Sequence, residues 1–131
     1  MDTEKPPYLG LLNRISIAER NAGRYLAAWA EMTPDPELAR ALGLVAARET
    51  THGEVFRQRI ERLGFTVRER EDPTLAERLR VYGDPAVSDA DKIRHGRRHA
   101  AKISAAAAMR SHATPSGSTS AKRSTAKAGP R

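Results

Sequence analysis

The chain has 131 residues, 30% of them charged, and a formal net charge of +7 at pH 7. This length allows one domain of ordinary size with some unstructured sequence beside it. There is no cysteine, which excludes disulfides, thiolate ligands and a cysteine nucleophile, so any metal would have to be held by Glu, Asp or His. Aromatic residues make up only 5%, and strand-favouring runs of Val, Ile, Thr and Tyr are missing. We therefore expect an all-α protein.

The positive charge is concentrated in the C-terminal third. Residues 1–90 contain 13 Lys and Arg against 15 Asp and Glu, a net charge of −2, whereas residues 91–131 contain 10 against 1, a net charge of +9. The basic balance therefore describes the C-terminal part, and the first two thirds must be interpreted separately.

Residues 8–32 have the spacing of an amphipathic helix. Counting Glu19, the positions of one stripe are separated by 3, 4, 3, 4 and 3 residues: Leu12, Ile15, Glu19, Ala22, Leu26 and Trp29. The segment TPDPEL then breaks the pattern, with Thr33 or Asp35 as a capping residue and a proline suited to a first helical turn.

A second stripe follows this break and ends before Gly64, which is a helix stop signal. Its members are Leu38, Leu42, Val45, Glu49, His52, Phe56, Ile60 and Leu63. Two helices of about 25 residues would each be about 38 Å long. Joined by a tight turn, they should form an antiparallel helical hairpin.

Beyond Gly64 the sequence predicts a charged connector, a short helix ending at Gly83, and a longer helix that starts at SDAD and continues to residue 112. The remainder is basic and of low complexity, so we expect a disordered tail. The predicted organisation is thus a hairpin over 8–64, a connector with accessory helices over 65–112, and a disordered tail over 113–131.

The two stripes contain three ionisable residues: Glu19 on the first, and Glu49 and His52 on the second. Burying a carboxylate without a partner is costly, so such residues normally have one. Glu19 lies about 15 residues before the turn and Glu49 about 15 after it, so they should face each other. Since i and i+3 share a helix face, His52 can point to the same spot. One Glu facing a Glu-x-x-His is half of the ligand set of a carboxylate-bridged di-iron site.

Two other interpretations use the same residues without a metal. Glu49 and His52 can form a surface pair, or meet Arg20, Arg48 or Arg57 in structural salt bridges. Alternatively, the three groups can form a buried polar network that fixes the register of a non-catalytic helical interaction module.

The first half of the chain resembles the encapsulated ferritins, which are two-helix members of the ferritin-like superfamily. The resemblance covers residues 10–65 and rests on Glu19, on Glu49-Thr-Thr-His52 thirty residues later, and on the DPEL turn formed by residues 35–38. It implies a hairpin of ferritin-like type that dimerises into a four-helix bundle.

The resemblance also implies a function. By the same resemblance, Glu19, Glu49 and His52 of two chains would bind two irons, and this site would oxidise Fe(II) with O₂. The dimers would assemble as a ring inside an encapsulin shell. Manganese or zinc would use the same ligand types. Residues 113–131 contain no short hydrophobic docking peptide of the Gly-Ser-Leu type that directs such cargo to the shell.

The C-terminal region suggests two further sites. Asp91, His95 and His99 have i, i+4, i+8 spacing, a candidate second metal site, although Arg94 lies among them. The basic residues of 91–131 could contact the phosphates of a nucleic acid without reading its sequence. A small helical nucleic-acid-associated protein is therefore the alternative function.

No membrane association is expected, because the apolar runs are short and broken by charge. The polar start MDTEKPPY does not have the pattern of a secretory signal. We expect a cytoplasmic protein, inside an encapsulin compartment if the resemblance extends that far.

Overall fold

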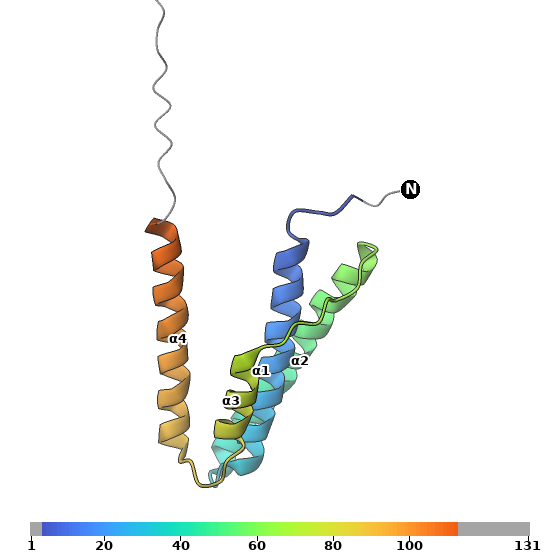
Figure 1. Cartoon of the computed structure of the whole chain (residues 1–131). Coiled ribbons are helices and arrows are strands. Elements are labelled where there is room, and N and C mark those ends of the chain that lie inside the picture. Colours follow the sequence, from blue (N-terminus) through green and yellow to red (C-terminus); the bar gives the residue numbers. More distant parts are fainter. Residues whose placement is uncertain (1–3, 113–131) are drawn as a thin grey trace, which may run out of the picture. The chain divides into compact units, whose positions relative to one another are not determined.

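The computed structural model describes residues 4–112, and within this range the chain forms helices and no strand, which confirms the all-α prediction (Figure 1). The helices are α1 (Leu9–Met32), α2 (Pro36–Arg62), α3 (Pro73–Tyr82) and α4 (Asp89–His112). The tail for which disorder was predicted lies outside the described residues. The chain divides into two compact units, Met1–His95 and Gly96–Arg131, so the division falls inside α4.

The helix ends follow from local sequence chemistry. The Asp35 carboxylate accepts hydrogen bonds from the backbone N–H groups of Glu37 and Leu38, and so caps α2. Asp72 caps α3 in the same way through the backbone N–H of Thr74. After α2 the backbone turns at Gly64, whose φ of 90° is a conformation that favours glycine.

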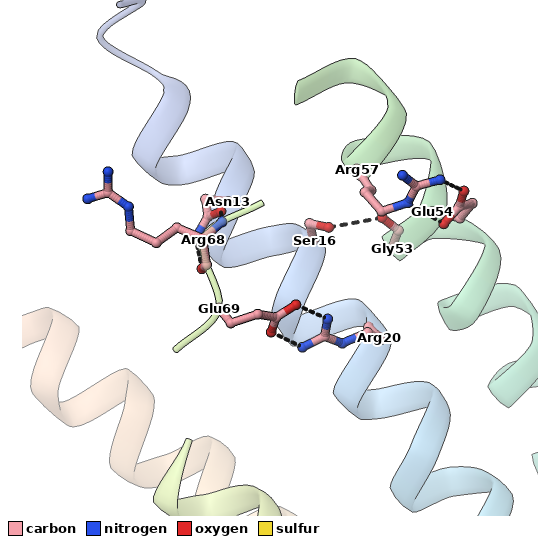
Figure 2. A network of polar contacts seen from close by, with 8 residues as sticks. All are labelled: Asn13, Ser16, Arg20, Gly53, Glu54, Arg57, Arg68 and Glu69. Atoms are coloured by element: carbon pink, nitrogen blue, oxygen red, sulfur yellow. Dashed lines mark hydrogen bonds and ion pairs between the residues drawn. The ribbon is translucent and has the colours of Figure 1, made fainter. Parts of the chain in front are cut away.

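α1 and α2 pack as an antiparallel pair along a seam of small residues. A Cβ atom on Gly53 would lie 3.0 Å from the backbone nitrogen of Arg20 and 3.1 Å from the carbonyl oxygen of Ser16. A Cβ atom on Gly23 would lie 3.2 Å from the carbonyl oxygen of Ala46. The Ser16 hydroxyl also donates a hydrogen bond of 3.0 Å to the carbonyl of Gly53 (Figure 2). The two backbones therefore approach closely, which explains glycine at two positions inside long helices.

The predicted stripes run beside this seam rather than along it. Their buried members are Trp29, Leu42 and Ile60. The other apolar members are only half-buried in the single chain: Leu12, Ile15, Ala22, Leu26, Leu38, Val45, Phe56 and Leu63. The closest approach of α1 and α2 is therefore made at small residues that lie outside the two stripes.

An aromatic cluster joins α3 to the C-terminal half of α1. The ring of Tyr82 stacks on Trp29 with 5.2 Å between centroids and on Tyr25 with 5.3 Å. Asp89, the first residue of α4, accepts a hydrogen bond of 2.9 Å from Trp29 Nε1 and one of 2.7 Å from the Thr33 hydroxyl. These contacts hold α3 and the start of α4 on α1.

The connector between α2 and α3 is fixed to α1 by polar contacts (Figure 2). The Asn13 side chain donates to the carbonyl of Arg68 at 2.9 Å and accepts from its backbone N–H at 2.7 Å. The next residue, Glu69, forms two hydrogen bonds of 2.7 Å with the guanidinium of Arg20. This paired arrangement fixes the position and direction of the connector.

The described part of the second unit consists of the continuation of α4 from residue 96 to residue 112. Its basic side chains Arg97, Arg98 and Lys102 are exposed. None of the helices described here, in either unit, has the length and apolar character needed to cross a membrane.

Candidate metal centre

Glu19, Glu49 and His52 lie together at the middle of the α1/α2 pair. One ligand atom from each side chain lies within 4.8 Å of the others. Among residues 4–112 they form the one cluster of at least three acidic or histidine side chains with this geometry. The structure therefore brings together all three residues that the sequence pattern placed at one spot.

The packing of the small-residue seam explains why these three side chains lie close together. Ser16 lies opposite Gly53, and Gly23 lies opposite Ala46. Glu19 falls between the first residues of these pairs, and Glu49 falls between the second. The small seam residues thus set the register that puts both carboxylates at the same level.

The cluster is half-open to solvent. The side chain of Glu49 is 17% exposed and that of His52 is 49% exposed. His52 Nδ1 lies 4.0 Å from Glu49 Oε1, and Arg48 Nε lies 3.3 Å from the same oxygen. Because the Arg48 side chain is 62% exposed, it can leave Glu49 for water without a large loss of packing.

The two carboxyl groups shift each other's pKa in opposite directions. A hydrogen bond with Glu49 raises the pKa of Glu19, and partial burial and the negative charge of Glu49 act in the same direction. The same hydrogen bond lowers the pKa of Glu49, with Arg48 assisting. Two facing carboxylates repel each other when both are ionised. A bound cation would offset this repulsion.

The ligand chemistry suits a transition metal of intermediate hardness. Two carboxylates and one imidazole are ligands that Fe(II), Mn(II) and Zn(II) accept. Metal–ligand bonds are about 2.0–2.2 Å long, so the ligand atoms of one ion would lie closer together than 4.8 Å. The three side chains would have to move inward to hold an ion, and the exposed His52 ring has room to do so. Three ligands also leave coordination positions open.

Tyr25 lies near enough to this cluster for the charges of Glu19 and Glu49 to act on its hydroxyl. Burial raises the pKa of its hydroxyl, and the charges of Glu49 and Glu19 add to that rise. The Tyr25 hydroxyl accepts a hydrogen bond of 2.8 Å from Arg78, a contact with α3 that no sequence pattern indicated. Trp29, one turn further on, belongs to the aromatic cluster.

The candidate second site on α4 spans the boundary between the two units, and its two members in the first unit make other contacts. Asp91 forms an ion pair with Arg94. The ring of His95 packs edge-on against Tyr82 at 5.8 Å between centroids. Both side chains are thus engaged in contacts that have nothing to do with a metal, and His99 is half-buried.

Comparison of the chain with known proteins finds no matching family model, no matching curated protein and no matching solved structure. The functional interpretation therefore rests on the site itself.

Proposed function

We propose that the protein is a ferritin-like, homo-oligomeric metal-binding protein that binds Fe(II) at a site shared by two chains and oxidises it. The observation that carries this proposal is the meeting of Glu19, Glu49 and His52 within 4.8 Å, at matched depth on two antiparallel helices. One chain supplies half of a four-Glu, two-His ligand set.

The surroundings of the cluster support a shared site. The three ionisable side chains lie in the middle of the half-buried apolar stripes, on a face that the single chain leaves partly open. A second copy packed on this face would bury the stripes and bring its own Glu19, Glu49 and His52 to the first set. The result would be a four-helix bundle with the ligands inside.

In this proposal each residue has a distinct role toward the substrate ion. Glu49, which has the lowered pKa, would supply the carboxylate already ionised. Glu19 would bind Fe(II) as its carboxylate, and His52 would bind through a ring nitrogen in its neutral form. With O₂ as oxidant, two Fe(II) would lose one electron each, and O₂ would take up two electrons and two protons to leave as H₂O₂.

The test is elemental analysis of the protein after anaerobic loading with Fe(II), beside Glu49→Ala/His52→Ala. We expect about one iron per chain in the wild type, because two half-sites complete one di-iron centre, and none in the variant. A control, Glu37→Ala/His99→Ala, removes the same residue types elsewhere and should keep the iron.

The possible outcomes distinguish a shared iron site from the other interpretations of these three side chains. Iron retained by Glu49→Ala/His52→Ala would overturn the assignment of the ligands. No iron in the wild type would make the three groups a structural network. Consumption of O₂ by the loaded protein, absent from the variant, would extend the proposal from binding to oxidation.

A further inference from the structure

A cavity of about 480 Å³ lies between the first half of α1 and the connector that follows α2. It is lined by ten residues, four of them cationic and none acidic: the cations are Lys5, Arg14, Arg68 and Arg70. None of the three proposed metal ligands is among the ten. The cavity is therefore a separate feature whose properties do not depend on the proposed function.

The extended connector determines which of its side chains face the cavity. Side chains alternate in direction along an extended chain. Thr66, Arg68 and Arg70 line the cavity, whereas Glu69 between them turns to the opposite side and pairs with Arg20 (Figure 2). The connector thus presents two arginines to the cavity, while the carboxylate of Glu69 is paired on the other side.

In the part of the chain that the structure describes, these four cations take part in no ion pair. The ion pairs found among residues 4–112 involve other basic residues, namely Arg20, Arg48, His52, Arg57 and Arg94. Four exposed positive side chains around one hollow repel each other, so a bound anion would stabilise the arrangement. Arginine in particular matches the oxygens of phosphate with paired N–H donors.

Two further properties of the cavity walls indicate which kind of ligand would fit. The first turn of α1 contributes Leu9 and Gly10, and it contains no acidic residue and has no side-chain cap at Tyr8, so its backbone N–H groups add to the attraction for an anion. Phe65 and the largely buried Leu9 give the cavity an apolar portion. A volume of this size is in the range of sites for small organic molecules.

We propose that this cavity binds a small phosphate-bearing molecule. Its phosphate oxygens would be held by Lys5, Arg14, Arg68 and Arg70, and any organic part would rest against Leu9 and Phe65. The contacts of Asn13 and Arg20 on α1 with the connector keep the two walls in place before the ligand arrives, which lowers the ordering cost of binding.

Isothermal titration calorimetry of the full chain with pyrophosphate and with ADP tests the proposal. We compare the wild type with Arg14→Gln/Arg68→Gln, which removes two cavity charges while leaving the backbone contacts of Arg68 intact. The control is Arg97→Gln/Arg98→Gln, which removes the same charge from exposed positions that do not line the cavity. Circular dichroism verifies that all three chains are equally helical.

We expect the cavity variant to lose at least about tenfold in affinity and the control to stay within about twofold, with weaker binding at higher salt. Tighter binding of ADP than of pyrophosphate, reduced by Phe65→Leu, would identify an organic phosphate, and equal binding would identify inorganic phosphate. Absence of binding by the wild type at millimolar ligand would overturn the proposal. Equal losses in the cavity variant and the control would also overturn it, because attraction would then follow net charge alone.

Discussion

At the scale of single residues, Asp89 makes the contact that joins the C-terminal end of α1 to the start of α4. Its two carboxylate oxygens accept hydrogen bonds from Trp29 and Thr33, and these bonds lower its pKa, with the charge of Lys92 adding to the effect. Lys92 itself is only 1% exposed. Hydrogen bonds to a charged group are among the stronger ones in proteins, so this carboxylate should contribute to stability.

Replacing Asp89 with asparagine should destabilise the protein by about 1–2 kcal/mol at neutral pH. The amide side chain is uncharged, and its nitrogen cannot accept a hydrogen bond as the second carboxylate oxygen does. The folded-state pKa of Asp89 is lowered, so its contribution is fully present above the unfolded pKa and is lost as the pH falls through the folded value. The difference between wild type and variant should therefore shrink below about pH 4.

Urea unfolding at pH 7 and at pH 3, followed by Trp29 fluorescence, measures this difference. The exposed Glu31 at the end of α1 offers a matched control, since Glu31→Gln should change stability by less than about 0.5 kcal/mol. A difference for Asp89→Asn that stays constant with pH would contradict the electrostatic explanation.

The meeting of Glu19, Glu49 and His52 could be predicted from residue types and spacing. Ionisable residues at stripe positions, and equal distances from a proline-containing turn, were enough to place them together. The contacts of Arg78 with Tyr25 and of Asp89 with Trp29 could not be predicted, because they link residues 53 and 60 positions apart across a fold whose later helices the pattern did not place.

At the scale of elements, the helix boundaries were largely readable from the sequence. The prolines and capping aspartates before α2 and α3, together with Gly64 and Gly83, give local signals that do not depend on the fold. The path of the connector and the pairing of the seam residues across the two helices were not readable. Both depend on how two helices approach each other, which a hydrophobic pattern on one helix does not determine.

The geometry of the seam predicts that replacing glycine with alanine has opposite effects on stability at two positions in α2. Gly53→Ala should destabilise the protein by about 1–3 kcal/mol, because its Cβ would lie 3.0 Å from backbone atoms of α1 that cannot move aside alone. Gly43→Ala should stabilise it by about 1 kcal/mol, because nothing lies within 4 Å and alanine is the better helix former.

Both variants can be compared with the wild type by chemical denaturation. Each is the control for the other, since the change in composition and in helix propensity is the same. Stabilisation by Gly53→Ala would show that the two backbones are further apart than the seam requires, and would also weaken the explanation of how Glu19 and Glu49 reach the same level.

At the scale of the whole molecule, the proposed site requires a second copy on the face that carries the half-buried stripes. Neighbouring residues of α2 test this requirement directly. Val45 belongs to the stripe, one turn before Glu49, whereas Leu44 is 68% exposed and is not part of the stripe. Val45→Lys would place a charge in the proposed contact between chains, and Leu44→Lys would place the same charge outside it.

Sedimentation velocity with parallel iron analysis should therefore separate these two variants. We expect Val45→Lys to be monomeric and to bind iron at least about tenfold more weakly, because an unpaired buried lysine is costly and each chain alone holds only half of the ligands. Leu44→Lys should sediment and bind iron like the wild type. A monomeric Val45→Lys that still binds iron fully would show that one chain completes the site, and dissociation of both variants would place the contact on a different face of α2.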